Sequence, residues 1–187
     1  MVSANALRRA VKVAPVTALQ VDYALFTRNI EATSGLPEAN ILTTCRELGV
    51  AIVAATPLGR GVLTSTYSEG QSFNDEFRRG FPRFQPESQK HNAVLLGPIQ
   101  AFAHKKECTI TQLALAWLLK QGADVFPIPG TRNPKYVEEN FAARKIQLSD
   151  EEEAEIRRYV ESVEVDGDIV PAYYRATVYL DTPEQKA

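Results

Sequence analysis

Cysteine, surplus charge and long apolar runs are all scarce in this sequence. Cys45 and Cys108 are its two cysteines. They lie far apart with no second metal-type ligand near either, which excludes a disulfide framework or a zinc cluster and fits a reducing compartment. Lys and Arg total 21 against 23 Asp and Glu. This balance provides no broad cationic surface for nucleic acid or acidic lipid, so we expect no nucleic-acid partner.

Membrane and export signals are also lacking. No apolar stretch approaches the roughly 20 residues that a membrane span requires. The N-terminus carries Arg8 and Arg9 before only a short mixed run, which is unlike a signal peptide. The sequence therefore predicts a cytoplasmic protein without a membrane partner.

The composition is that of a globular protein with one core. Apolar residues make up 44% of the chain and charged residues 24%, with 11 Pro and 10 Gly. These values fit neither a collagen-like nor a low-complexity chain. With 187 residues and no evident linker, the chain predicts a single domain, smaller than the roughly 250 residues of a complete eight-stranded α/β barrel.

Helical and strand patterns alternate along the chain. Compact apolar or β-branched runs predict strands over residues 16–21, 50–55 and 125–128. Apolar spacing with capping and breaking residues predicts helices over 3–11, 38–48, 93–106, 134–140 and 149–162, and one more helix capped by Thr111 and ended by Gly122. Residues 57–90 are expected to form a long functional or mobile connection, and residues 163–187 a loosely docked tail.

This alternation is typical of a parallel α/β sheet with its helices outside. Strands that are apolar without interruption occur where both faces of a sheet are covered. Three strands are too few to close a barrel. Because ligands of such folds meet the loops that follow the strands, three segments are candidate binding sites.

The first two candidates follow the first two predicted strands. The amide of Gln20 offers a donor and an acceptor, which suits a carboxamide, or it is simply a polar strand end. Residues 56–61 read TPLGRG. Glycine lets backbone amides approach a phosphate closely and arginine adds a bidentate charge, although any tight loop can contain two glycines.

The third candidate follows the third strand and precedes a helix. It contains Gly130, Thr131, Arg132 and Lys135. Helix amides and the macrodipole favour a phosphate here, and the two cations suit a terminal phosphate such as the 2′-phosphate of NADP. The alternative is a solvated turn whose cations keep it soluble. Residues 138–140 lie further along the helix, where they would meet an adenine edge.

Other conspicuous residues have ordinary explanations. His91 and His104 lie on polar segments with no Ser or Cys nucleophile placed beside them. Trp117 lies on an apolar helix face and is expected in the core. The acidic residues 150–153 complement a helix dipole. The sequence contains no P-loop, G-x-G-x-x-G fingerprint or zinc-binding spacing.

Five motifs, spread in order over residues 3–155, together resemble the aldo-keto reductase family. They are residues 19–28 (LQVDYALFTR), 45–50 (CRELGV), 57–61 (PLGRG), 112–118 (QLALAWL) and 128–132 (IPGTR), the last followed by Glu139-Asn140. The family is an α/β (TIM) barrel of NADPH-dependent carbonyl reductases. Compared with it, residues 1–187 look like the C-terminal part of the barrel domain, strands six to eight with their helices, and 165–187 like its tail.

The resemblance implies a cofactor site at the matching positions. Gln20 would hydrogen-bond the nicotinamide carboxamide, the segment after the second strand would line the pyrophosphate, and the third segment would hold the 2′-phosphate and the adenine. The implied NADPH-binding residues are Gln20, Thr56, Pro57, Leu58, Gly59, Gly61, Gly130, Thr131, Arg132, Lys135, Glu139 and Asn140. Ala55 departs from the pattern, because many members have an aromatic residue there that stacks on the nicotinamide.

The resemblance also implies a reaction. Family members transfer hydride from the nicotinamide to a carbonyl while a Tyr donates the proton, assisted by Lys, Asp and usually His from the ends of the first four strands. None of those strands lies in this sequence, so no catalytic residue is assigned. The tyrosines not taken as proton donors are Tyr23, Tyr136, Tyr173, Tyr174 and Tyr179.

We therefore expect the NADP-binding portion of an NADPH-dependent aldo-keto reductase, inactive as the isolated chain, whose complete form reduces aldehydes or ketones to alcohols. The alternative is a noncatalytic nucleotide-binding or regulatory module of the same fold. Three strands leave two unpaired edges and an uncovered inner face. We expect a fragment or the product of a truncated gene model, with either a missing N-terminal half or a second copy covering the exposed strands.

Overall fold

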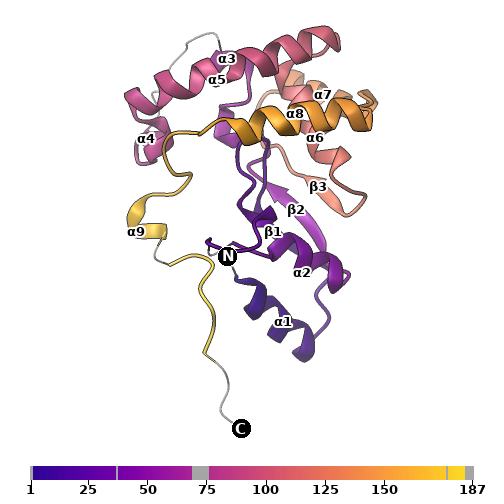
Figure 1. The fold of residues 1–187 in the computed structure, drawn as a ribbon, viewed down its shortest axis with the longest axis vertical. Helices are drawn as coiled ribbons and strands as arrows, with labels where there is room; N and C mark the ends of the chain where they lie inside the picture. The colour runs from indigo at the N-terminus through magenta and orange to yellow at the C-terminus, as the bar shows by residue number, and fades with distance from the viewer. Residues whose placement is uncertain (1, 37, 69–75, 176, 184–187) are drawn as a thin grey trace.

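A computed structural model describes residues 2–36, 38–68, 76–175 and 177–183 (Figure 1). Its sheet has three strands, β1 (Ala18–Asp22), β2 (Ala51–Ala55) and β3 (Val125–Pro127), in the order β1-β2-β3. Both pairs are parallel. The predicted parallel α/β arrangement, with strands in these three places, is confirmed.

Helices alternate with the strands. The chain runs through α1 (Ala4–Val13), β1, α2 (Ile41–Glu47), β2, α3 (Ser65–Ser68), α4 (Glu76–Arg79), α5 (Pro86–Lys105), α6 (Ile110–Lys120), β3, α7 (Pro134–Ala142), α8 (Asp150–Ser162) and α9 (Ala172–Arg175). Short 3-10 turns occur at Asn29–Glu31, Gly59–Gly61, Pro82–Phe84 and Ala143–Lys145. Within the described residues, none of the helices has the length and apolar character needed to span a membrane.

The sheet has one covered and one open face. Ile52, Ala54 and Val125 are buried on the side where α2 lies against β2 and α6 against β3. Register places Gln20, Val53 and Phe126 side by side on the other face. Phe126 is 53% exposed there. The core is therefore built between the sheet and its helices, and the inner face of the expected barrel is open.

Capping side chains determine where two of the predicted helices begin. Ser149 and Glu152 form the expected capping box, and four acidic residues occupy the first turn of α8. Helix α6 begins with a capping box of Thr109 and Gln112. The prediction that Thr111 caps this helix was wrong, because Thr111 lies within its first turn and its buried hydroxyl donates to the Leu63 carbonyl at 3.3 Å.

The expected connection over residues 57–90 is largely structured where it is described. Besides short helical turns, it contains the first part of α5, which starts at Pro86 and not at residue 93. Proline fits a first helical position because its missing N–H has no partner to lose there. This part of α5 lacks an apolar stripe, since its buried positions are Ser88 and Asn92. Both side chains hydrogen-bond Asp166.

The described part of the C-terminal tail is docked at several points, and the expectation of a loosely docked tail was wrong. Val178 and Tyr179 are buried, and the tail runs past β1 to the side of α1 (Figure 1), where Asp181 accepts hydrogen bonds from Ser3 and Asn5. Long-range polar contacts hold this segment, and a local apolar pattern does not reveal them.

The carboxylate of Glu38 is the innermost polar contact of the tail. Glu38 is 1% exposed, and it is paired with Arg175 of α9. Asn40, in the left-handed region with φ 63°, then directly precedes α2. The helix expected over 38–48 therefore begins at Ile41 instead, and Glu38 is free to face the tail.

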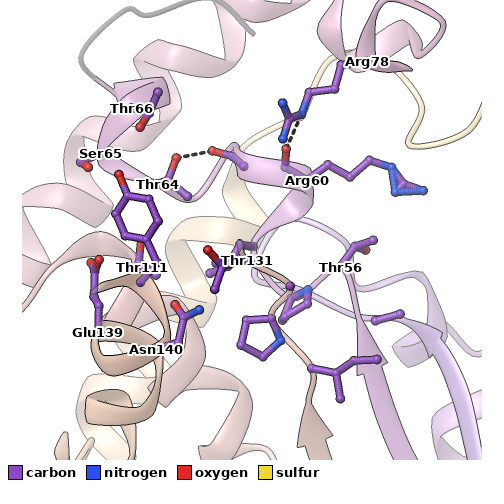
Figure 2. Close-up of a pocket in the computed structure, with 18 of the residues that line it drawn as sticks. Thr56, Arg60, Thr64, Ser65, Thr66, Arg78, Thr111, Thr131, Glu139 and Asn140 are labelled. Atoms are coloured by element: carbon purple, nitrogen blue, oxygen red, sulfur yellow. Dashed lines mark hydrogen bonds between the residues drawn. The ribbon is translucent and has the colours of Figure 1, made fainter. Parts of the chain in front are cut away.

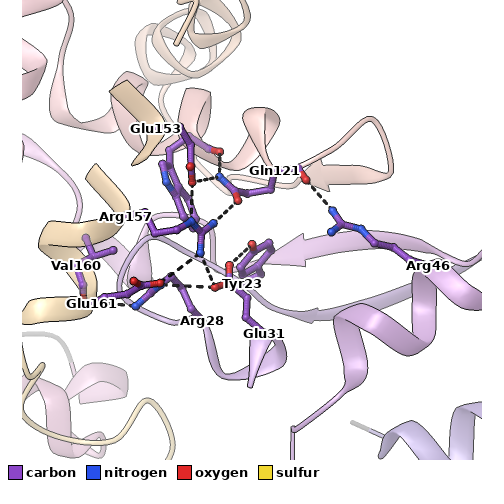
Figure 3. Close-up of polar contacts among 10 residues, drawn as sticks. Tyr23, Arg28, Glu31, Arg46, Gln121, Glu153, Arg157, Val160 and Glu161 are labelled. Carbon is purple, nitrogen blue, oxygen red and sulfur yellow. Dashed lines mark hydrogen bonds and ion pairs between the residues drawn. The ribbon is translucent and has the colours of Figure 1, made fainter. Parts of the chain in front are cut away.

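A polar network ties α8 to the end of β1 (Figure 3). The Tyr23 hydroxyl donates to Glu31 at 2.5 Å, and Arg157 of α8 donates to the other carboxylate oxygen of Glu31 at 2.9 Å. Arg157 also bonds Glu153 and Gln121. Burial raises the pKa of Tyr23, and the neighbouring Glu31 raises it further.

Replacing Arg175 by Gln should destabilise the protein by roughly 3 kcal/mol, because it leaves a buried carboxylate without its cation. The free energy of unfolding is measured by urea denaturation followed by circular dichroism. Arg8→Gln is the matched control, since the Arg8–Glu47 pair is exposed and should change stability by less than about 1 kcal/mol. Equal effects of the two substitutions would show that the tail contact is peripheral.

The free energy of unfolding should fall as the pH rises above about 10, the ordinary pKa of tyrosine. Tyr23 keeps its proton in the folded state while the unfolded chain loses it, so its stabilising contribution is complete below that pH and declines above it. Tyr23→Phe should make this decline shallower by up to about 1.4 kcal/mol per pH unit. Tyr136→Phe, at an exposed position, should leave the decline unchanged; identical profiles for all three proteins contradict the interpretation.

Candidate nucleotide-binding cleft

A cleft of about 540 Å³ lies where the three strands end (Figure 2). Its walls come from the end of β1, the segment after β2, the segment after β3 and helix α7. The lining residues are Gln20, Ala55, Thr56, Pro57, Leu58, Arg60, Gly61, Thr64, Ser65, Thr66, Arg78, Thr111, Ile128, Pro129, Gly130, Thr131, Tyr136, Glu139 and Asn140. Parallel strands end at one edge of the sheet, which explains why segments distant in sequence meet here.

Most of the residues selected from the sequence share this cleft. Those that line it are Gln20, Thr56, Pro57, Leu58, Gly61, Gly130, Thr131, Glu139 and Asn140. Gly59 instead borders a much smaller cavity behind the same turn. Arg132 and Lys135 lie outside the lining and are exposed. The structure thus brings all three predicted segments together without placing every predicted side chain in the cleft.

The turn after β2 has an unusual backbone. Gly59 and Gly61 have φ of 57° and 107°, in the region that glycine tolerates, but Thr56 and Arg60 also have positive φ, 48° and 56°. The Gly59 N–H donates to the Thr56 carbonyl at 2.8 Å, and the Gly61 N–H donates to the Leu58 carbonyl at 3.0 Å. The glycines of the PLGRG motif therefore have a conformational role.

A row of hydroxyl groups on this turn and α3 was not selected from the sequence. Thr64, Ser65 and Thr66 follow the PLGRG segment after Val62 and Leu63, and all three line the cleft. The Thr64 hydroxyl donates to the Gly61 carbonyl at 2.6 Å. A hydroxyl-rich stretch next to a glycine-rich loop is the signal that sequence reasoning passed over.

Two arginines also line the cleft; Arg60 was considered from the sequence as a phosphate-binding charge, whereas Arg78 was not. Arg78 of α4 donates through Nε to the Arg60 carbonyl at 2.8 Å. The Arg60 guanidinium stacks on Phe81, 4.7 Å from the ring centroid, and Figure 2 shows it directed away from the hydroxyl row. Arg60 therefore forms the margin of the cleft, while Arg78 supports the turn.

The segment after β3 is held by short-range hydrogen bonds. Thr131 Oγ1 accepts from the Asn133 N–H at 3.1 Å, and Asn133 Oδ1 caps α7 by accepting from the Lys135 N–H at 3.0 Å. One turn further, Glu139 accepts from the Thr109 hydroxyl at 2.7 Å. The last contact orients the Glu139 carboxylate relative to α6, so α6 and α7 present one continuous wall.

Relatives of this chain were found among proteins and solved structures. Aldo-keto reductase yakc of Schizosaccharomyces pombe, whose name carries NADP(+), is 44% identical over 182 residues, covering 97% of this chain and 52% of that protein. Aldo-keto reductase str7 of Strobilurus tenacellus is 42% identical over 167 residues, covering 89% of this chain and 48% of that protein. The chain spans about half the length of the curated relatives it matches.

Solved structures show the same fold. The glycerol dehydrogenase of Gluconobacter oxydans has a TM-score of 0.70 at 24% identity, over 82% of this chain and 45% of that one. An aldo/keto reductase from Klebsiella pneumoniae, solved with NADP and acetate, has a TM-score of 0.52 at 25% identity, over 82% of this chain and 44% of that one. These likenesses confirm the predicted partial (β/α) barrel.

The resemblance read from the five motifs is confirmed by a family model as well. The model for the aldo/keto reductase family matches residues 2–161, which include the complete sheet and all three segments that meet at the cleft. The chain therefore belongs to the aldo/keto reductase family.

Proposed function

We propose that the cleft binds NADPH and that this chain is the cofactor-binding portion of an enzyme that reduces aldehydes or ketones to alcohols. The observation that carries the proposal is the single cleft shared by the segments after β1, β2 and β3. The NADP(+) in the name of the S. pombe relative and the NADP in the K. pneumoniae structure support this choice of cofactor.

The donor groups of the cleft suit a phosphorylated ligand. Ser65 and Thr66 bring hydroxyl groups to its lining, and Arg78 brings a guanidinium group. Such groups donate to phosphate oxygens, and cationic donors form the stronger bonds. The volume of about 540 Å³ also falls in the range of roughly 300–1,000 Å³ typical of small-molecule sites.

Different parts of the cleft would hold different parts of the cofactor. Gln20, on the open face of the sheet, would pair with the nicotinamide carboxamide, and the turn over residues 56–61 would line the pyrophosphate. Thr131 would face the 2′-phosphate, with Arg132 and Lys135 reaching it from the exposed rim. Glu139 and Asn140 complete the wall where the adenine would lie.

Bound NADPH would supply the hydride for carbonyl reduction. The side chain of Ala55 cannot stack on a nicotinamide ring, so the orientation of the ring would depend on Gln20. Tyr23 is fully buried and its hydroxyl is bonded to Glu31, which does not suit a proton donor to substrate. The proton donor and its assisting residues would come from the part of the barrel that lies outside this chain.

Completion of the barrel would also cover the open face of the sheet. Phe126 and Ile128 are 53% and 47% exposed there, and β1 and β3 are the outer strands of the described sheet, so each has an edge that another strand could join. Further strands would bury both, coming either from an N-terminal half of the kind the longer relatives contain or from a second copy of this chain.

Replacing Arg132 and Lys135 together by Ala should weaken NADPH binding at least tenfold and NADH binding less than twofold, because only NADPH carries the 2′-phosphate that they would contact. Dissociation constants for both nucleotides are measured by calorimetry with the 187-residue chain. The control Arg158→Ala removes an exposed cation on α8 and should change neither constant. Equal losses for the two nucleotides would assign these cations no role in selectivity.

The isolated chain should bind NADPH without oxidising it in the presence of simple aldehydes or ketones. Mixing it with the part of the S. pombe relative that this chain does not match should restore NADPH oxidation, measured by absorbance. Carbonyl reduction by the isolated chain would contradict the proposal that the catalytic residues lie outside it. A mixture that binds NADPH but reduces nothing would favour a noncatalytic module.

A further inference from the structure

Thr56 is a cleft residue with a strained backbone conformation. It follows β2 directly, lines the cleft and has a φ of 48°. A β-branched residue in the left-handed region costs roughly 1–3 kcal/mol and persists only when its surroundings hold it there. The groups that bond Thr56 therefore decide the path of the turn.

The group that holds Thr56 is the carboxylate of Asp22. Asp22 ends β1 in register with Ala55, the last residue of β2. This register brings its side chain beside the next residue of the neighbouring strand, and the Thr56 hydroxyl donates to Asp22 Oδ1 at 2.7 Å. Asp22 is 7% exposed, so water competes little for this bond.

The backbone of Thr56 is also hydrogen-bonded to the turn that follows it. The Thr56 carbonyl accepts from the Gly59 N–H at 2.8 Å, and the Leu58 carbonyl accepts from the Gly61 and Leu63 N–H groups at 3.0 and 3.1 Å. A rotation of Thr56 out of the left-handed region would turn its carbonyl away from Gly59. The segment from Pro57 to Gly61 would then leave its position along the cleft.

Asp22 itself does not line the cleft, although Gln20 and Thr56 on either side of it do. Its second oxygen, Oδ2, is buried and has no hydrogen-bond partner within the described part of the chain. Leaving such an oxygen unpaired costs about 1–3 kcal/mol. The buried guanidinium of Arg83 is near enough to interact electrostatically with Asp22, and the backbone N–H of Asp22 faces the hydroxyl of Tyr179.

We propose that Asp22 is a positioning residue of the nucleotide cleft. Its carboxylate holds Thr56 in the left-handed conformation and thereby sets the path of residues 57–61 along the bound pyrophosphate. The inference rests on the proposed NADPH binding for its functional effect, while the conformational effect on the turn belongs to the ligand-free protein.

Three substitutions at Thr56 separate positioning from direct contact. Thr56→Val keeps the β-branched shape and loses the hydroxyl, so the turn should relax and NADPH binding should weaken about tenfold, the loss expected for one hydrogen bond to a charged group. Thr56→Gly loses the same hydroxyl but tolerates positive φ without it. It should therefore bind NADPH at least threefold more tightly than Thr56→Val, and Thr56→Ser, which keeps the hydroxyl, should recover more of the wild-type affinity than Thr56→Val does.

The decisive comparison pairs these changes with Asp22→Ala. In the wild-type background Asp22→Ala should weaken NADPH binding about tenfold, and in the Thr56→Gly background less than twofold, because glycine no longer needs the bond. The control Asp124→Ala removes the carboxylate of an Arg46 pair outside the cleft lining and should have no effect on binding. A tenfold loss on both backgrounds, or wild-type binding by Thr56→Val, overturns the proposal.

Amide hydrogen exchange tests the turn without any ligand. The amides of Gly59 and Gly61 should exchange at least tenfold faster in Asp22→Ala and Thr56→Val than in the wild type, whereas the amide of Leu113 in α6 should be unchanged. Unchanged exchange at both glycines overturns the proposal even if binding weakens. If the wild-type chain fails to bind NADPH, the proposed function fails and exchange alone decides the role of Asp22. Should Asp22→Ala not fold, Thr56→Val removes the same hydrogen bond from its donor side and provides the comparison.

Discussion

Parallel, in-register pairing of three short strands is the constraint on which the rest of the molecule depends. The β1–β2 and β2–β3 pairings align Gln20 with Val53 and Val53 with Phe126. All three strands consequently end at one edge, and the segments that follow them converge into one cleft. An offset of one residue would turn Gln20 and Asp22 from the open face into the helix-covered core, because side chains alternate between the two faces.

Helices cover one face of this sheet and leave the other face open. Helices α2 and α6 bury Ile52 and Val125 completely or nearly so, whereas Phe126 on the opposite face is half exposed. A closed barrel has neither free edges nor an exposed interior. The chain covers about half of each of the two curated relatives, and in such a barrel the remaining strands would join the outer edges of β1 and β3 and enclose the open face. Under the proposed function, the cofactor contacts would come from this chain and the catalytic contacts from the rest of the barrel.

Local patterns predicted the elements whose own residues carry a distinctive apolar run or cap. Compact apolar or β-branched runs located β1, β2 and β3, and the capping box of Ser149 and Glu152 located α8. The start of α5 was missed because its buried face carries Ser88 and Asn92, which satisfy Asp166 instead of filling an apolar stripe. The docking of the C-terminal tail was missed because it also depends on polar contacts, and Arg175 contacts Glu38 across 137 positions of sequence. Most of the cleft followed from strand ends, but no periodicity indicates which way a surface side chain such as Arg132 extends.

The turn after β2 shows why a glycine-rich motif gives only part of a binding loop. Glycine accounts for the positive φ at Gly59 and Gly61, yet Thr56 and Arg60 adopt the same region without that freedom. Each has a long-range partner instead: Asp22 from β1 bonds the Thr56 hydroxyl, and Arg78 from α4 bonds the Arg60 carbonyl. The strain of the loop is thus offset by residues that the motif does not contain. Two chains with an identical PLGRG segment can therefore present different backbone surfaces to a phosphate, and the difference originates at the end of the neighbouring strand.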